Sequence, residues 1–258
     1  MRPQILVTND DGITAKGINC LVQAIKHLGD IIVVAPDGPR SAQSNAITVH
    51  DPLRYWKQYE EPGVVAYRCN GTPSDCVKIG AHAIMKSQPD LLVSGINHGS
   101  NSSVNVIYSG TMGAAFDGCM MGITSIGLSL CSHDPDADFT EAVRLSVPIV
   151  ERVLKEGLPK DVCLNVNFPD IPNIKGVRVA RQCRGRWMER FVERVDPLGR
   201  PYLWLTGDFV NLEPDASDTD EAVIAAGYGA VTPCHIDVTD HAAMAQLSAY
   251  NYDAEKEV

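Results

Sequence analysis

Short, uninterrupted apolar runs that alternate with helix-like segments constrain the fold of this chain more than any other feature. The apolar runs occupy residues 4–8, 31–35, 64–69, 90–95, 123–130 and 161–168. The segment that follows the first run carries apolar residues at helical spacing: Ile18, Leu21, Val22, Ile25 and Leu28. Strands that are apolar on both faces and alternate with helices form parallel sheets covered on both sides. We therefore predict an α/β fold built on a doubly wound, mostly parallel, Rossmann-like sheet.

The pattern changes from about residue 178. Alternating residues on both sides of the turn DPLGR (196–200) predict a long β-hairpin, which carries Trp187 and Trp204 in a segment too short to bury them. A helix and a strand are expected over 219–233, and a terminal helix over 239–250. We predict an α/β core over residues 1–177 and a C-terminal region over 178–258 that serves in oligomerisation.

Composition excludes several classes of protein. The net charge of -10 disfavours duplex nucleic acid as a partner. There is no apolar run of about 20 residues and no signal-peptide pattern at the N-terminus, so we predict a cytoplasmic protein that does not span a membrane. The eight cysteines form no CxxC pair and lie mostly in apolar runs, which favours buried free thiols over structural zinc.

Polar residues stand repeatedly where the predicted strands end. Asp10 and Asp11 follow the first strand, Ser41 follows the second, and Asn97 and Asn101 follow DLLVSG. Ligands of open α/β sheets bind at these carboxyl ends. A bend at Gly12 would bring both carboxylates to one point, where a hard divalent cation would offset their repulsion. The alternative is a solvated turn at Asp11-Gly12.

Ser109-Gly110-Thr111, followed by small residues, predicts a second binding element. Small residues at the start of a helix expose backbone amides, and the helix dipole favours an anion there. A capped helix that packs closely through glycine and alanine would explain the same residues without a ligand. The stretch does not match the pattern GxxxxGK[ST] of nucleoside-triphosphate-binding loops.

Ordered blocks over nearly the whole chain resemble the SurE family, the stationary-phase survival nucleotidases. The matching blocks are ILVTNDDG (5–12), PRSAQS (39–44), ITVHDPLR (47–54), NGTPSDCVKIG (70–80), PDLLVSGINHGSN (89–101), YSGTMGAAFDG (108–118) and TDEAVIAAGYGAVTP (219–233). One departure is Ala42, where the family usually has glycine after the serine ligand.

The resemblance implies both an activity and a site. The metal ligands of the family fall on Asp10, Asp11, Ser41 and Asn97, and its phosphate-binding residues on Asn101, Ser109, Gly110 and Thr111. The implied activity is hydrolysis of nucleoside 5′-monophosphates, and also of 3′-monophosphates, with one Mg²⁺ or Mn²⁺ per subunit. Homodimers or homotetramers that exchange a C-terminal hairpin or helix are the implied assemblies.

We hypothesise that a metal-activated water attacks the phosphate. Asp10 and Asp11 would hold the metal, one of them would take the proton of the water, and Asn101 would stabilise charge on the phosphate oxygens. Two alternatives remain open. An aspartyl-phosphate phosphatase of the haloacid-dehalogenase type would need DxDx[TV], whereas this chain has Asn9-Asp10-Asp11-Gly12-Ile13. A non-catalytic nucleotide sensor on the same fold would be expected to have lost a metal ligand.

Overall fold

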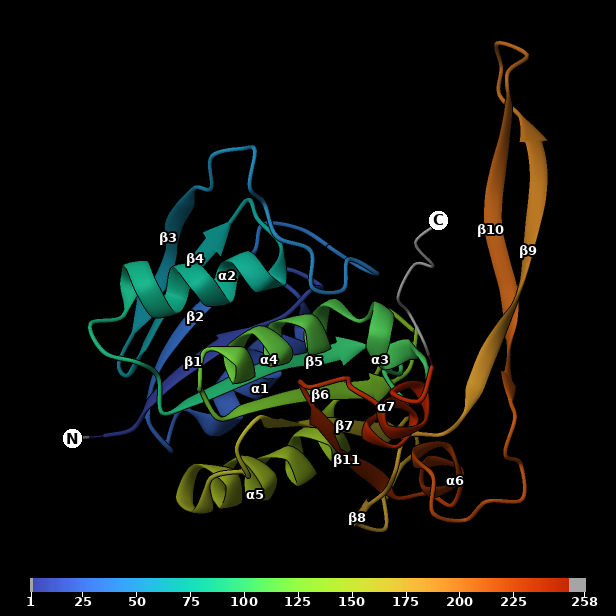
Figure 1. The fold of residues 1–258 in the computed structure, drawn as a ribbon. Coiled ribbons are helices and arrows are strands. Elements are labelled where there is room, and N and C mark those ends of the chain that lie inside the picture. Colours follow the sequence, from blue (N-terminus) through green and yellow to red (C-terminus); the bar gives the residue numbers. More distant parts are fainter. Residues whose placement is uncertain (1, 251–258) are drawn as a thin grey trace, which may run out of the picture.

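The computed structural model describes residues 2–250 and contains one large, nine-stranded sheet (Figure 1). In spatial order its strands are β3 (Tyr55–Glu61), β4 (Val64–Cys69), β2 (Asp30–Pro36), β1 (Gln4–Thr8), β5 (Leu91–His98), β6 (Ser125–Cys131), β7 (Val162–Pro169), β11 (Gly229–His235) and β8 (Val177–Val179). All neighbours from β4 to β7 are parallel, whereas β3 and β11 run antiparallel to β4 and β7. The predicted doubly wound, mostly parallel sheet is confirmed.

Helices cover both faces of this sheet. The helices of the described residues are α1 (Lys16–Ile25), α2 (Pro73–Ile79), α3 (Asn105–Tyr108), α4 (Gly110–Met120), α5 (Thr140–Glu156), α6 (Asp220–Ala225) and α7 (His241–Leu247), with a π-helical turn, η1 (Gly80–Ile84), after α2; α7 buries none of its residues. In β1, Ile5 and Val7 pack with α1 and α5, while Leu6 between them packs with α2 and α4. Successive strand residues point to opposite faces, so a strand covered on both sides must be apolar throughout.

The winding of the sheet changes direction beside β1. The next strand in the chain, β2, lies on one side of β1, and β5 lies on the other. The loops after β1 and β5 therefore meet, and the backbone amide of His98 donates to the Asp11 carboxylate at 3.1 Å. This is the point at which open α/β sheets bind their ligands.

The main sheet continues past residue 177, because β11 pairs with β7 and β8 pairs with β11. The strands β3 and β8, at the two edges, are elements that the apolar runs did not reveal. Both are largely exposed, so they lack the continuous apolar character of the central strands. Within residues 2–250, no helix has the length and apolar character needed to cross a bilayer.

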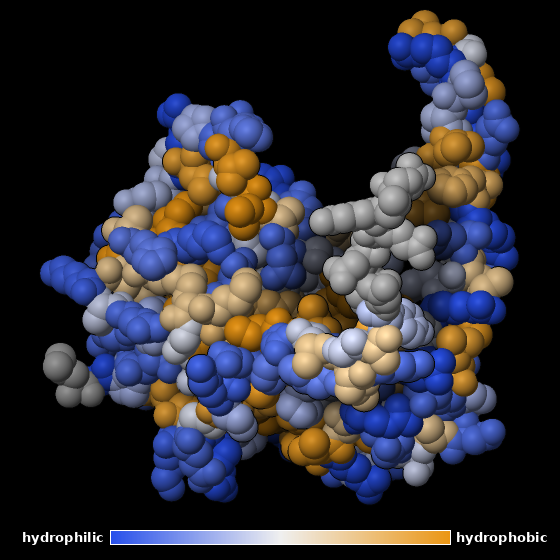
Figure 2. All heavy atoms as spheres, viewed as in Figure 1, coloured by the Kyte–Doolittle hydropathy of each residue, from blue (hydrophilic) through white to orange (hydrophobic). Residues whose placement is uncertain are grey.

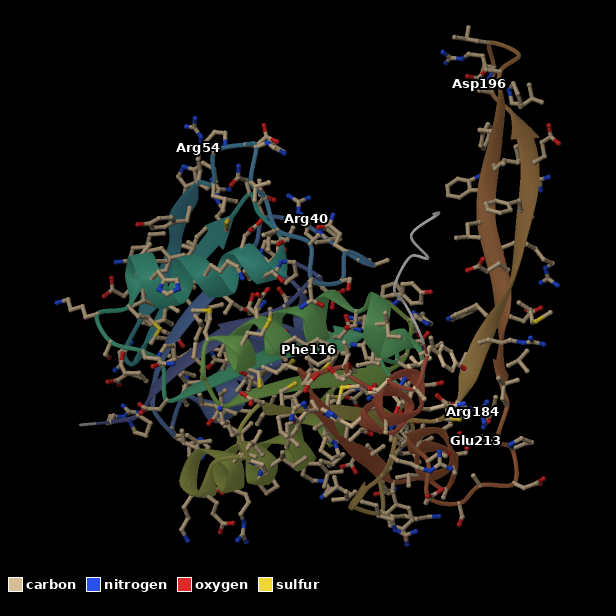
Figure 3. The ribbon with its side chains drawn as sticks, in the orientation of Figure 1. Arg40, Arg54, Phe116, Arg184, Asp196 and Glu213 are labelled. Atoms are coloured by element: carbon tan, nitrogen blue, oxygen red, sulfur yellow. The ribbon has the colours of Figure 1, made fainter. Side chains whose placement is uncertain are left out.

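The predicted hairpin is present and forms a sheet of its own. Among residues 2–250, β9 (Gly185–Val195) and β10 (Pro201–Asn211) pair only with each other, and they project from the body of the molecule (Figure 1). Figure 2 shows apolar side chains along this projection, and the most exposed of them include Phe191, Leu203, Trp204 and Leu205. In Figure 3, Asp196 marks the tip, while Arg184 and Glu213 mark the base, where the Arg184 amide donates to the Glu213 carboxylate at 2.6 Å.

Candidate active site

A cavity of about 480 Å³ opens at the carboxyl ends of β1 and β5. Five of the residues predicted from sequence line it: Asp10, Ser41, Asn97, Asn101 and Ser109. Gly110 and Thr111 stand directly beside Asp10, and Asp11 lies against the end of β5. The structure thus brings together the residues that the sequence placed at separate strand ends.

Asp10 is held by the turn after β1 and by the start of α4. The Asn9 side chain closes the turn, because it donates to the Gly12 carbonyl at 2.9 Å and accepts from the Gly12 amide at 3.2 Å. Gly12 has a φ of +99°, a conformation that a side chain would strain. From the other side, the Thr111 hydroxyl donates to Asp10 Oδ1 at 2.5 Å. The Asp10 carboxylate therefore has one defined position.

Asp10 and Asp11 place two carboxyl groups side by side, and the pKa of each is raised. Burial is the main cause that raises the pKa of Asp10 to about 6, and the charge of Asp11 adds to it, while Thr111 acts in the opposite direction. Burial also raises the pKa of Asp11, although the His98 amide opposes that shift. Within residues 2–250, no Lys or Arg forms an ion pair with either carboxylate, and only the ring of His98 approaches Asp11, at 3.8 Å.

Asn97 and Ser41 supply neutral oxygen atoms beside this pair. The Asn97 side chain donates through Nδ2 to the Gly99 carbonyl at 2.9 Å. No group in the described part of the chain donates to its Oδ1, which leaves that oxygen available as a ligand. Ser41 lies in an exposed loop that borders the cavity. In residues 2–250 there is no cluster of three or more His, Cys, Asp and Glu side chains placed to hold a metal, so a cation here would depend on these neutral oxygens.

Asn101 is fixed by a buried network from two neighbouring strands. Its backbone amide donates to Asn167 Oδ1 at 2.7 Å, and its carbonyl accepts from Asn165 Nδ2 at 2.8 Å. Its side chain donates to the Ser129 hydroxyl at 2.8 Å, which uses one of the two amide protons. The signal for this network is visible in the sequence as two asparagines in the otherwise apolar run of β7.

The start of α4 borders the cavity with donors. Ser109 caps the helix, because its hydroxyl oxygen accepts from the Met112 amide at 3.0 Å, and its own proton stays free to donate. The Gly110 amide has no acceptor in the part of the chain that the structure describes. A Cβ on Gly110 would lie 2.9 Å from the Asp10 Cβ, so glycine permits the close approach of the helix to the carboxylate. The Thr111 hydroxyl is engaged by Asp10 rather than directed at a ligand.

Several residues that line the same cavity had no role predicted from the sequence, among them Trp187, Phe209 and Glu221. Trp187 and Phe209 come from the base of the hairpin, and Glu221 comes from α6. Ser102, in the loop after β5, donates to the Glu221 carboxylate. The exposed tryptophan of the predicted hairpin was the signal that pointed to this region.

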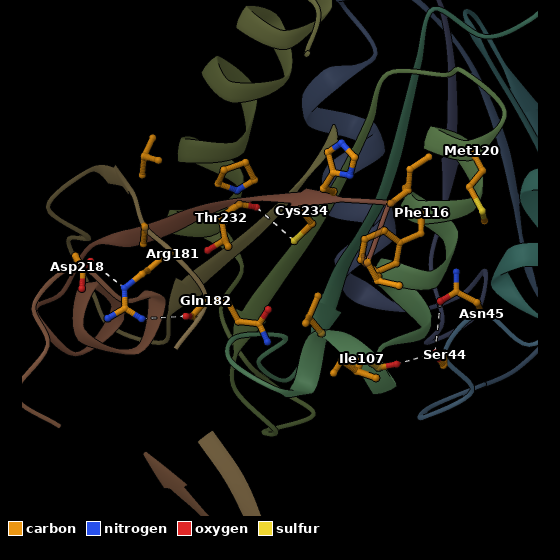
Figure 4. A pocket seen from close by; sticks show the side chains of 17 residues that line it. Ser44, Asn45, Ile107, Phe116, Met120, Arg181, Gln182, Asp218, Thr232 and Cys234 are labelled. Carbon is orange, nitrogen blue, oxygen red and sulfur yellow. Dashed lines mark hydrogen bonds and ion pairs between the residues drawn. The ribbon is translucent and has the colours of Figure 1, made fainter. Parts of the chain in front are cut away.

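A larger cavity of about 1020 Å³ lies elsewhere and contains none of the predicted site residues. Figure 4 shows Ile107, Phe116 and Met120 along it, with Arg181 and Asp218 paired at 2.9 Å on the other side. The Asp218 carboxylate there is paired with Arg181, and the Cys234 thiol has a pKa raised by burial to about 11, so neither resembles the adjacent carboxylates of Asp10 and Asp11. Chemistry therefore points to the smaller cavity, although the larger one has more volume.

The cysteines agree with the sequence analysis. All eight are free, and each of them is buried or partly buried. None of them lines the cavity at Asp10 except Cys131, whose pKa burial raises to about 11. A thiol with such a pKa is neutral near pH 7 and is a poor nucleophile.

Comparison with known proteins identifies the family of this chain. The family described as "Survival protein SurE" matches residues 5–189. A 5′-nucleotidase SurE of Phocaeicola vulgatus is 50% identical over 252 residues, which cover 98% of each chain, and one of Cytophaga hutchinsonii is 47% identical over 96% of each. The crystal structure of the SurE protein from Aquifex aeolicus superposes with a TM-score of 0.81 at 36% identity, and the match covers 95% of this chain and 98% of that one. The chain belongs to the SurE family.

Proposed function

We propose that this chain is a divalent-metal-dependent phosphomonoesterase that hydrolyses nucleoside 5′-monophosphates, and also 3′-monophosphates, to nucleoside and phosphate. The observation that carries the proposal is the uncompensated pair Asp10-Asp11, which faces the donors at the start of α4 across the switch point of the sheet. Relatives that bear the name 5′-nucleotidase SurE and align over nearly the whole chain support it.

The donor set fits one divalent cation per subunit. Asp10, Asp11, Ser41 and Asn97 would hold it, since carboxylate, amide and hydroxyl oxygens are the ligands that Mg²⁺ and Mn²⁺ prefer. The raised pKa values of both carboxyl groups support a cation at this point, as does the absence of a Lys or Arg ion pair to either of them within residues 2–250. When bound, the cation supplies positive charge that offsets the charge of the phosphate and lowers the pKa of water.

The protein's own groups position the phosphate and move the proton. Asn101, the Ser109 hydroxyl and the Gly110 amide donate to phosphate oxygens, assisted by the positive end of the α4 dipole. The Asp11 carboxylate accepts from the His98 amide through Oδ2, and its Oδ1, which has no hydrogen-bond partner among residues 2–250, accepts a proton from the attacking water. Thr111 keeps the Asp10 carboxylate oriented.

Phosphate release from a panel of nucleoside monophosphates tests the function. The panel is run with Mn²⁺, Mg²⁺ and Ca²⁺ and again with a chelator, and we expect release that depends on Mn²⁺ or Mg²⁺ and stops with the chelator. Phosphate release that persists in chelator would rule out the metal dependence. Binding of nucleotides without release of phosphate under every metal would identify a sensor instead.

We also propose that the subunits form a homodimer or homotetramer. The apolar side chains along the hairpin and the apolar walls of the 1020 Å³ cavity support this assembly. Size-exclusion chromatography with light scattering would measure the mass, and a monomer of 28.0 kDa at micromolar concentration would refute the proposal. A cytoplasmic location stays a prediction that cell fractionation can test.

A further inference from the structure

The cavity at Asp10 has an aromatic wall that hydrolysis of a phosphate ester does not by itself require. Trp187 and Phe209 face each other across the base of the hairpin, where they are direct partners in the β9–β10 ladder. Their rings meet edge to face, with centroids 6.0 Å apart. A polar cavity for inorganic phosphate would gain nothing from two large aromatic rings.

Trp187 is anchored at its edge, while much of its surface stays open. Its indole Nε1 donates to Asn105 Oδ1 at 2.9 Å, yet 42% of the residue is exposed. Gly185, two residues before it in β9, allows the close packing of the hairpin base, because a Cβ there would lie 2.4 Å from the Phe209 ring. An indole fixed at its edge with open surface is suited to stacking on another planar ring.

A buried carboxylate ties this aromatic wall to the catalytic loop. Asp220 accepts from the Ser103 amide at 2.8 Å and from the Cys183 amide at 2.9 Å, and thereby links the loop after β5 to the entry of the hairpin. Asp220 is fully buried. The position of Trp187 relative to Asn101 is therefore fixed by the protein before any ligand binds.

Glu221 adds an acceptor between these regions. Its Oε1 accepts from the Ser102 hydroxyl, and no group in residues 2–250 donates to its Oε2. A carboxylate repels a phosphate but accepts a hydrogen bond from a sugar hydroxyl. The volume of about 480 Å³ lies in the range of pockets that hold small ligands.

We propose that this cavity binds the whole nucleotide, with Trp187 stacking on the nucleobase and Glu221 accepting a hydrogen bond from a ribose hydroxyl. The inference rests on the proposed nucleotidase function and names the residues that select a nucleotide over other phosphate esters. The phosphate lies at Asn101 and Ser109, and the base extends toward the hairpin.

Kinetics with two substrates test the stacking. AMP carries a base, and ribose 5-phosphate does not. We expect Trp187→Ala to lower kcat/KM for AMP by about 10-fold to 100-fold through KM, with a much smaller change for ribose 5-phosphate. Trp187→Phe should restore most of the activity on AMP. The matched control is Trp56→Ala, because Trp56 is 43% exposed and lies on the edge strand β3, away from the cavity.

The ribose contact has its own test. The wild-type protein should prefer AMP over 2′,3′-dideoxy-AMP, and Glu221→Ala should abolish that preference. If the variant keeps the preference, Glu221 does not contact the ribose. If Trp187→Ala lowers kcat/KM equally for AMP and for ribose 5-phosphate, or for neither of them, Trp187 does not stack on the base.

Tryptophan fluorescence separates this inference from the proposed activity. The chain has three tryptophans, so Trp56→Phe/Trp204→Phe leaves Trp187 alone. With Mn²⁺ present, the non-hydrolysable phosphonate analogue of AMP should quench this fluorescence saturably, whereas methylphosphonate should not. Quenching without phosphate release from any nucleotide would keep the base site and reject the nucleotidase. Release of phosphate from a nucleotide without quenching would keep the nucleotidase and reject the base site at Trp187.

Discussion

The loops after β1 and β5 and the base of the hairpin line one cavity but are held in different ways. Asp10 and Asn101 are each 5% exposed, and buried partners from α4, β6 and β7 hold them. In the described part of the chain, the strands of the hairpin pair only with each other, and a few contacts at the base of the hairpin connect it to the body. The rigidly held groups at the carboxyl ends of β1 and β5 are suited to chemistry, while the hairpin is suited to recognition and association. Substitutions at the carboxyl ends of β1 and β5 should therefore alter turnover, and substitutions in the hairpin should alter ligand binding and subunit assembly.

The largest expected effect comes from Asp10→Asn. Loss of one charged ligand should lower turnover by at least about 100-fold to 1,000-fold. Because burial raises the pKa of Asp10 to about 6, the ionised carboxyl destabilises the folded, metal-free protein. That penalty is absent below about pH 4 and complete above about pH 6, at roughly 2–3 kcal/mol. At pH 7.5 with chelator, we expect Asp10→Asn to have a higher Tm than the wild type.

Addition of Mn²⁺ should reverse that order. The wild type should gain Tm with Mn²⁺, and the gain should shrink as the pH falls through about 6, where protons compete for Asp10. Asp10→Asn should gain little at any pH. Scanning calorimetry at pH 5 and 7.5 measures both effects. A wild-type turnover in Asp10→Asn, or an equal Mn²⁺ shift in both proteins, would contradict the assignment.

The next effect is expected from Gly110→Ala. The new Cβ would lie 2.9 Å from the Asp10 Cβ, so the carboxylate or the start of α4 must move. A displacement of this size at a catalytic group should lower kcat by about 10-fold to 100-fold, while the fold persists. Gly38→Ala is the control, because no atom lies within 4 Å of a Cβ there. If both variants kept full activity, the close approach of α4 to Asp10 would have no catalytic value.

A smaller effect on turnover, but a clear one on assembly, is expected in the hairpin. Leu203 and Leu205 lie on one face of β10 and are 60% and 61% exposed. Leu203→Asn/Leu205→Asn should shift the oligomer toward monomer, since polar side chains remove apolar contact area. Lys57→Asn on the exposed edge strand β3 is the control. Light scattering gives the mass, and an unchanged mass for the double variant would place the subunit contact outside this face.

Sequence patterns predicted the central strands well, because a strand that is buried on both faces is a continuous apolar run in the sequence. The run at 4–8 coincides with β1, and the run at 64–69 with β4. The edge strand β3 was not predicted because its sequence, YWKQYEE, is largely exposed and contains no apolar run. The pairing of β11 with β7 was not predicted, because the local sequence of a C-terminal strand does not encode which strand of the sheet it pairs with.

In the site, too, residues placed by the local pattern of strands could be predicted, whereas residues placed by contacts between distant segments could not. Asp10, Asn97 and Asn101 could be predicted because parallel strands end at one edge of a sheet. Trp187 and Glu221 could not, because their place in the cavity depends on how the hairpin and α6 fold back on the loop after β5. The Asp220 carboxylate makes that connection, and nothing in its local sequence distinguishes it from a solvated acidic residue.

The smallest expected effect concerns Ala42, the position at which the resemblance leads us to expect glycine. Ala42 has a φ of 58°, a left-handed conformation that favours glycine and costs alanine about 1 kcal/mol. Ala42→Gly should therefore raise the free energy of unfolding by up to about 1 kcal/mol and should leave turnover within about twofold, because the Ser41 loop keeps its path. Ala46→Gly, in the same exposed loop but without a positive φ, should lower that free energy slightly, since glycine gains freedom in the unfolded chain. Urea unfolding measures the free energy of unfolding of both variants. Equal changes in that free energy would mean that the backbone at Ala42 carries no strain, and that the loop beside the cavity tolerates either residue.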